Sequence, residues 1–488
     1  MVDVPILAKT SRVWPGGARS AGDDPAGTRP RGGRGALPRL PSTGVDPAEF
    51  GEIAMWIGAV IACLGLTAFL HAGGSDTEPL PTPLAAIPFT VDRRLHISPT
   101  SLLAPAVMAA VIVATWRNFH IRMRWGPLLV AGYAASLAWS LALASVNGLS
   151  GLAGPLGGPQ GYLSELAAVD AGPMGFLRAY TQQAVSYGYG IRSHPPGLVM
   201  LLWALTRMGI RSPSALGVVL AALSASTVPL AAIAVRSLCH ALAARRLVPV
   251  LVLAPWAVWI PATDGMTTAL AVGFVTLGVI GSEPGRRLRW AAGCGLGIGV
   301  AALCGYGVVW LGVAVVATYF VRRRPLLNVI TGACVLVPLS VAAVLGFSWP
   351  DGLAVAHQQV VATAHHPGSG PGVPAWIVRI PIGLTVVLIA CGPTIVRATR
   401  RIRLTPGWPF LVGAVPAIGF GILTGVASAD VERSWLPLYC WLLVPALAPN
   451  PRPDRPGDTT RAGTLPLGLT GVGALTAIAA RAFLPGNL

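Results

Sequence analysis

The chain has 488 residues, of which 53% are apolar and only 11% are charged, and its mean hydropathy is +0.66. A soluble globular protein carries about 25% charged residues, so this chain has too few charges to cover a water-facing surface of its size. The composition excludes a cytosolic enzyme, a DNA-binding factor and a secreted disulfide scaffold. The formal net charge is +17, from 35 Lys and Arg against 18 Asp and Glu. These cations cluster between apolar runs, which indicates membrane topology rather than nucleic-acid binding.

The N-terminal 50 residues are rich in Gly, Pro, Arg and Ser and contain no long apolar stretch. Such a segment cannot bury enough apolar surface to fold alone. We therefore expect residues 1–50 to form a disordered, basic cytoplasmic tail. The first long apolar run begins near residue 53, which is too late for a cleavable signal peptide.

Beyond the tail, the apolar runs predict an all-α bundle of about thirteen transmembrane helices. A bilayer core of about 30 Å needs roughly 17–25 apolar residues per helix. We expect two N-terminal spans in 51–126, a core in 127–450 with outer loops 147–212 and 348–375, and a cytoplasmic loop with a last span in 451–488. The predicted spans are 53–71, 101–116, 127–146, 213–236, 247–263, 265–281, 289–304, 306–321, 326–347, 376–396, 408–427, 434–448 and 464–484.

One further apolar run, 197–210, would extend only about 21 Å as a helix, so we interpret it as interfacial or re-entrant. With this run left out of the count, the seven segments on the cytoplasmic side hold 26 of the 35 Lys and Arg. That distribution follows the positive-inside rule. It predicts a multi-pass plasma-membrane protein with a cytoplasmic N-terminus and both large loops outside. No ionisable residue lies clearly in the middle of a predicted span, which counts against a coupled transporter.

The first outer loop contains the carboxylates Glu165 and Asp170, then Arg192, and then His194 at the start of a His-Pro-Pro-Gly sequence. An ordinary solvated loop would explain two such carboxylates. A catalytic loop would explain them equally, because a carboxylate can take a proton from an attacking hydroxyl. The spacing alone does not separate these two interpretations.

Three other polar groups lie where predicted spans end. Asp264 stands between two apolar runs, where a helix cap is the simple interpretation. Glu432 and Arg433 precede a short span on the outer side, and they form either an interfacial ion pair or a site for an anionic group. A weak metal signal comes from three histidines of the second outer loop, namely His357, His365 and His366.

Four motifs follow one another along the chain. They are Tyr162-Leu163 in the first outer loop, Arg192-Ser-His194-Pro-Pro-Gly197, Pro255-Trp-Ala-Val-Trp259 followed by Asp264, and Glu432-Arg433-x-Trp435-Leu-x-Pro. Over about 127–450 they resemble the GT-C class of integral membrane glycosyltransferases. More narrowly, they are similar to actinobacterial membrane proteins related to the polyprenyl-phosphate-sugar mannosyltransferases.

The resemblance implies a hexosyltransferase-type enzyme with its active site on the extracytoplasmic face. The donor would be a polyprenyl-phosphate-linked sugar such as mannose, and the acceptor an outer-face glycan or lipid. Some members of the class use a divalent metal ion, whose ligands we leave unassigned here. The acidic base of the class usually precedes the loop Tyr, where this chain has Pro159-Gln160-Gly161. We therefore expect Glu165 or Asp170 to be the base, with substrate contacts from Tyr162, Arg192, His194, Asp264, Glu432 and Arg433.

Two alternatives remain at this point. A transporter or lipid flippase would need a polar path through the bilayer centre and usually internal pseudo-symmetry, and the sequence shows neither. A catalytically degenerate membrane scaffold of the same fold is favoured by the missing acid before Tyr162. The transferase interpretation predicts that Glu165, Asp170, His194, Asp264 and Arg433 meet in one outer-facing cavity.

Overall fold

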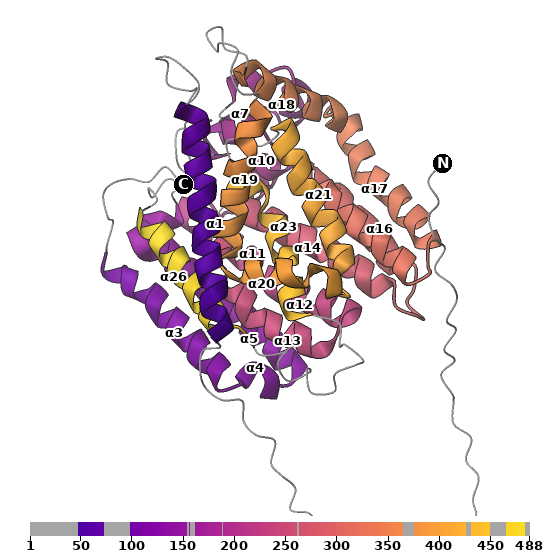
Figure 1. The fold of residues 1–488 in the computed structure, drawn as a ribbon. Helices are drawn as coiled ribbons and strands as arrows, with labels where there is room; N and C mark the ends of the chain where they lie inside the picture. Colours follow the sequence, from indigo (N-terminus) through magenta and orange to yellow (C-terminus); the bar gives the residue numbers. More distant parts are fainter. Residues whose placement is uncertain are drawn as a thin grey trace, which may run out of the picture. The chain divides into compact units, whose positions relative to one another are not determined.

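The computed structural model describes residues 47–72, 98–153, 156, 162–187, 189–260, 263–364, 375–425, 431–448 and 465–483. These residues form helices and connecting turns, with no strand among them (Figure 1), which confirms the all-α prediction. Residues Val45–Leu488 make up one compact unit. Most of the predicted basic tail lies outside the described residues, as do His365, His366 and the Pro159-Gln160-Gly161 segment.

Six segments of the described chain are helices long and apolar enough to cross a membrane, which makes this a helical membrane protein. A seventh is added if α19 (Ala375–Cys391) and α20 (Thr394–Arg401), which are bent by 107° at the break between them, count as one span. The described residues thus hold fewer full-length spans than the thirteen predicted. The six are Pro47–Leu70, Pro99–Trp116, Trp125–Ala144, Pro213–Leu238, Thr263–Gly281 and Leu326–Leu345.

The remaining predicted runs are helical but shorter, and turns or distorted segments interrupt several of them. The run 247–263 divides into the end of α13 (Ala241–Val252) and a 3₁₀ turn, η6 (Pro255–Trp259). Pro255 begins that turn, because proline offers no N–H for a continuing helix. Other interrupted runs give α15 (Arg289–Ala302), η7 (Tyr306–Trp310), α16 (Leu311–Val321), α23 (Leu436–Leu442) and α24 (Val444–Leu447).

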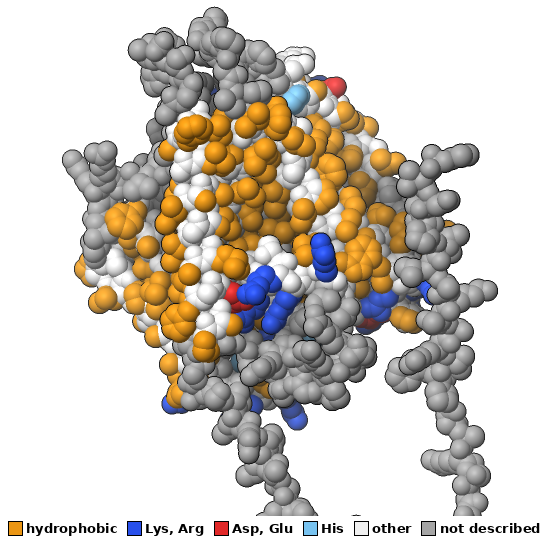
Figure 2. Space-filling view, in the orientation of Figure 1, with side chains coloured by type: hydrophobic (Ala, Val, Ile, Leu, Met, Phe, Trp, Pro, Cys, Tyr) orange, Lys and Arg blue, Asp and Glu red, His pale blue; other side chains and the backbone are white. Residues whose placement is uncertain are grey.

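The longer helices arrange themselves around α14 (Thr263–Gly281), which packs against α11, α12, α15, α16 and α23. Most of α14 is buried, whereas α1, α3 and α17 are mainly exposed, and apolar side chains cover much of the face shown in Figure 2. Residues on this central helix are therefore enclosed by several neighbouring helices. The bounds of the other long helices are α1 (Pro47–Ala72), α3 (Leu103–Trp116), α5 (Trp125–Ala144), α11 (Pro213–Ala225), α12 (Thr227–Leu238), α17 (Leu326–Leu345), α18 (Trp349–Ala364), α21 (Trp408–Thr424) and α26 (Leu467–Phe483).

The predicted first outer loop folds into short helices. The apolar run at 197–210 becomes α10 (Gly197–Arg207), whose eleven residues are too few to cross a bilayer. It packs against α7 (Leu166–Ala171). The neighbouring short elements are η4 (Tyr162–Glu165), α8 (Pro173–Ala179), η5 (Ala184–Ser186) and α9 (Tyr189–Arg192).

Several arginine clusters that the sequence assigns to the cytoplasmic side meet in space. Arg245 donates to the backbone carbonyls of three residues in and beside α4 (Phe119–Arg122). Arg322 donates to the carbonyl of Ser237 at 2.6 Å, and Arg324 donates to that of Glu283 at 2.7 Å. Glu283 follows the C-terminal end of α14 and accepts a hydrogen bond from Ser237, so Arg322 and Arg324 lie at that end of the central helix. Basic side chains also gather toward the lower part of the face in Figure 2.

A buried ion cluster ties α1 to the bundle. Arg397 of α20 donates to the Glu52 carboxylate from Nε at 2.9 Å and from Nη2 at 2.7 Å. Glu49 lies 3.8 Å from the same guanidinium. All three side chains are almost completely buried, so α1 has a defined register against α20.

Candidate functional site

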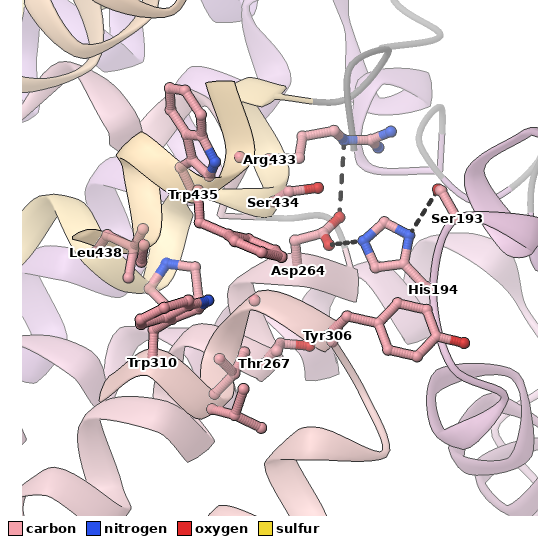
Figure 3. Close-up of a pocket in the computed structure, with 18 of the residues that line it drawn as sticks. Ser193, His194, Asp264, Thr267, Tyr306, Trp310, Arg433, Ser434, Trp435 and Leu438 are labelled. Atoms are coloured by element: carbon pink, nitrogen blue, oxygen red, sulfur yellow. Dashed lines mark hydrogen bonds and ion pairs between the residues drawn. The ribbon is translucent and has the colours of Figure 1, made fainter. Parts of the chain in front are cut away.

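A cavity of about 240 Å³ lies between α14, η7, α21, the short helix α22 (Val431–Ser434) and the turn that carries His194 (Figure 3). Its polar side chains come from α14, α22 and the His194 turn. The rest of its wall is mostly apolar and aromatic. The polar lining residues are Ser193, His194, Asp264, Thr267, Arg433 and Ser434, and the large aromatic ones are Tyr306, Trp310, Trp349, Phe420 and Trp435.

Asp264 lies in the first turn of α14 and is only 5% exposed. The next residue must be small: a Cβ on Gly265 would lie 2.2 Å from the Ile260 carbonyl oxygen and 2.6 Å from Ser224 Oγ. The Asp-Gly pair therefore lets the start of α14 pack closely against its neighbours. A carboxylate at this end of a helix is favoured by the exposed N–H groups and the helix dipole.

His194 contacts both Asp264 and its own neighbour Ser193. Its Nε2 lies 3.4 Å from Asp264 Oδ1, and its Nδ1 lies 3.0 Å from Ser193 Oγ. The Tyr180 hydroxyl lies 2.7 Å from the carbonyl oxygens of both Ile191 and His194, which share its one proton, and so holds the backbone of this turn. Burial raises the pKa of Tyr180 well above its ordinary value, which keeps the phenol protonated as a donor.

The His-Pro-Pro-Gly sequence is attached to the end of α15. The Gly197 N–H donates to the Leu303 carbonyl at 2.9 Å, and a Cβ on Gly197 would lie 2.2 Å from that same oxygen. No larger residue fits this approach without a backbone shift. Because Leu303 directly precedes the Cys304–Tyr306 stretch that reaches the cavity, the motif positions His194 against the cavity wall.

Arg433 faces Asp264 from the other side (Figure 3). Its Nε lies 3.9 Å from Asp264 Oδ2, and its side chain is 16% exposed. Asp264 therefore has a histidine near one oxygen and a guanidinium near the other. This arrangement compensates for the burial of the carboxylate, which would otherwise be costly.

The structure thus brings together three of the residues singled out from the sequence, namely His194, Asp264 and Arg433. The other three proposed substrate contacts do not line this cavity. Tyr162 lies in a separate hydrophobic cluster with Phe176 and Tyr180. Arg192 and Glu432 are sequence neighbours of lining residues, and the Glu432 carbonyl accepts a hydrogen bond from Tyr439.

The two carboxylates expected to be the base also lie outside the cavity lining. Asp170 is on the surface, with a side chain 52% exposed, and it accepts hydrogen bonds from Trp203 Nε1 at 2.7 Å and Arg207 Nε at 3.1 Å. Arg207 Nη2 also forms an ion pair with it at 2.8 Å. It therefore ties α7 to α10. Glu165 lies near Tyr187, whose pKa is raised by burial and by the Glu165 charge. Sequence spacing could not separate these carboxylates from Asp264, because the separation depends on how the loop packs.

Several cavity residues had no signal in the sequence beyond their type. Thr267 and Ser434 are small hydroxyl residues in apolar surroundings, and Trp349 and Tyr306 are aromatic residues near helix ends. The lining segment Gly305-Tyr306-Gly307 falls where the predicted spans 289–304 and 306–321 meet. His357 is exposed on α18 and does not line the cavity.

The described residues contain no group of three or more His, Cys, Asp or Glu that could hold a metal ion. Asp264 is the single carboxylate among the described lining residues, and it lies between a histidine and a guanidinium. Divalent cations such as Mg²⁺ prefer several oxygen ligands, and Arg433 would repel them. This set of residues does not fit the divalent metal implied by the resemblance, so no step is assigned to one.

Comparisons of the chain with protein-family models, with curated proteins and with solved structures find no match. A buried carboxylate held by a histidine can accept a proton from a hydroxyl group. The adjacent guanidinium can stabilise a developing anion.

Proposed function

We propose that the chain is a GT-C-like membrane glycosyltransferase. It would move a sugar, with mannose the first candidate, from a polyprenyl-phosphate donor to a glycan or lipid acceptor on the outer face. The observation that carries this proposal is the convergence of His194, Asp264 and Arg433 in one cavity with aromatic walls. These residues come from three distant parts of the chain, and a simple solvated-loop interpretation gives no reason for them to meet.

The position of the cavity along α14 supports an extracytoplasmic site. Asp264 lies in the first turn of this 19-residue helix, and the arginine-bonded Glu283 follows its last turn. At 1.5 Å per residue the two ends are about 28 Å apart, which is close to the thickness of a bilayer core. The positive-inside rule assigns the arginine end to the cytoplasm, so the cavity would face outside.

Asp264 is the better candidate for the base, in place of Glu165 or Asp170. In the proposed reaction the acceptor oxygen attacks C1 of the sugar, its proton passes to the Asp264 carboxylate, and the bond from C1 to the phosphate oxygen breaks. The departing polyprenyl phosphate takes the electron pair, and Arg433 stabilises its charge. His194 would hold the carboxylate in position through its Nε2.

The lining also suits an amphiphilic donor. Aromatic rings provide large apolar area, and indole faces can pack on the C–H faces of a sugar ring. The wall that includes Trp310, Phe420 and Leu438 is apolar and would accept the first isoprene units. The shorter apolar helices would complete the bundle of about thirteen membrane segments around this cavity.

The decisive experiment compares Asp264→Asn with Asp170→Asn in proteoliposomes supplied with radiolabelled polyprenyl-phosphate mannose and a lipid extract as acceptor. Loss of a general base lowers kcat by about 10²- to 10⁴-fold, which we expect for Asp264→Asn. The Asp170→Asn protein should keep its rate within about twofold, because an exposed pair contributes little. An Asp264→Asn protein that transfers sugar at the wild-type rate would refute the assignment of Asp264 as the base. Absence of any wild-type transfer or donor cleavage, with mannose and glucose donors alike, would refute the proposed function.

A further inference from the structure

Two hydroxyl groups of the cavity have no hydrogen-bond partner among the residues that the structure describes. They are Thr267 Oγ1 of α14 and Ser434 Oγ of α22, both of which are shielded from solvent. Thr267 is only 4% exposed. Buried polar side chains in proteins are nearly always paired, so each exception needs an explanation.

Thr267 differs from three other threonines in the membrane helices. Thr268 and Thr276 of the same helix donate to the carbonyls four residues earlier, at 2.8 Å and 2.7 Å, and Thr318 of α16 does the same. That local bond is the ordinary way to satisfy a helical threonine. Thr267 does not make it, although a neighbouring residue does, so its hydroxyl remains available to a molecule in the cavity.

The surroundings of the two hydroxyls indicate what kind of molecule this is. Asp264 lies one turn from Thr267 on α14, and Arg433 directly precedes Ser434. Trp349 stands edge-to-face against Tyr306, with ring centroids 5.6 Å apart, and both line the cavity. A ligand with several hydroxyl groups and an apolar C–H face, such as a pyranose ring, could hydrogen-bond the polar side chains and pack against the aromatic rings.

We propose that Thr267 and Ser434 hydrogen-bond hydroxyl groups of the transferred sugar and thereby select which sugar is accepted. This inference rests on the proposed function and extends it from the reacting groups to the residues that recognise the substrate. A site built to bond a hydroxyl discriminates strongly against an analogue that lacks it, because its polar groups are then left unpaired.

The test measures binding rather than transfer. The probe is farnesyl-phosphate mannose, a short-chain donor, and its binding to the purified full-length chain is followed by tryptophan fluorescence. Farnesyl phosphate without a sugar is the matched ligand. The variants are Thr267→Val and Ser434→Ala, and Thr268→Val is the control because its hydroxyl is already bonded within the helix.

We expect Thr267→Val and Ser434→Ala each to weaken binding of farnesyl-phosphate mannose about 2- to 13-fold, the loss associated with one hydrogen bond. Binding of farnesyl phosphate should stay the same, as should the affinity of Thr268→Val for both ligands. A donor whose sugar lacks the contacted hydroxyl should bind wild type and variant equally. Each variant must unfold at the wild-type temperature, which excludes a folding defect.

Three outcomes would overturn the inference. Variants that bind farnesyl-phosphate mannose like wild type would mean that the hydroxyls bond only water. Equal weakening of both ligands would mean that they contact the phosphate or the lipid. Equal weakening by Thr268→Val would mean a general effect on α14. In each case wild-type binding and transfer would still support the proposed function, whereas a wild type that binds neither ligand and transfers no sugar would refute both.

Discussion

Replacing Gly197 with alanine should both destabilise the protein and displace His194. The added Cβ would lie 2.2 Å from the Leu303 oxygen, whereas a carbon and an oxygen that are not bonded need about 3 Å. The two segments must therefore separate by about 0.8 Å, which breaks the 2.9 Å bond from the Gly197 N–H to Leu303. Both residues are only partly buried, so the loss of this hydrogen bond costs about 0.5–1.5 kcal/mol.

The structure provides both a control and an assay for this prediction. Gly175 of α8 has open space where its Cβ would lie, so Gly175→Ala should be neutral or slightly stabilising. Thermal unfolding can be followed with a thiol-reactive dye, because all seven cysteines are free and four of them are buried. We expect a lower unfolding temperature and reduced sugar transfer for Gly197→Ala alone. A Gly197→Ala protein that unfolds and transfers sugar like wild type would show that the motif does not hold His194.

Two further predictions concern the arginine-rich end. Arg397→Gln leaves the buried Glu52 carboxylate without its guanidinium and should destabilise the protein by about 3–5 kcal/mol. Arg400→Gln, which removes a largely exposed partner of the same carboxylate, should cost less than about 1 kcal/mol; equal losses in dye-monitored unfolding would contradict this reasoning. Burial alone would raise the pKa of Glu283, but hydrogen bonds from Ser237 and a neighbouring arginine lower it below 4.5. Because its pKa is lowered on folding, the Glu283 carboxylate stabilises the folded protein fully at pH values above the ordinary pKa. This stabilisation is lost as the pH falls through the pKa of the folded state. Glu283→Gln should therefore flatten the acid limb of stability measured against pH, and an unchanged limb would refute the assignment.

The helical, membrane-embedded character of this chain follows from the sequence alone. Long apolar runs separated by arginine clusters leave no other way to satisfy the backbone in a bilayer. The lengths of the helices do not follow so directly. The sequence separates 289–304 from 306–321 at Gly305 and Gly307. The span predicted for 376–396 instead contains the 107° bend between α19 and α20, which falls at Gly392-Pro393, where Gly392 adopts a φ of +64°.

In the candidate site, too, the sequence indicates some features and only the packing decides the others. Polar residues at the ends of apolar runs marked His194, Asp264 and Arg433 as noteworthy, and the Pro-Pro-Gly sequence marked a fixed turn. Nothing in the sequence ranked Asp264 above Asp170: Asp264 stands between two apolar runs and Asp170 lies in the first outer loop, and the topology predicts both to be outside. Packing separates them: Asp170 pairs with Arg207 at the surface, and Asp264 lies at the tip of the central helix.

Only the tertiary structure shows that the hydroxyls of Thr267 and Ser434 line the cavity. In the sequence Thr267 is one of two adjacent threonines in an apolar helix, and only the packing shows that Thr268 bonds its own helix while Thr267 lines a cavity. Composition determines which segments leave water, because burial of apolar surface depends on residue type. Which polar side chains then meet is decided by contacts between distant segments, and local sequence does not encode those distances.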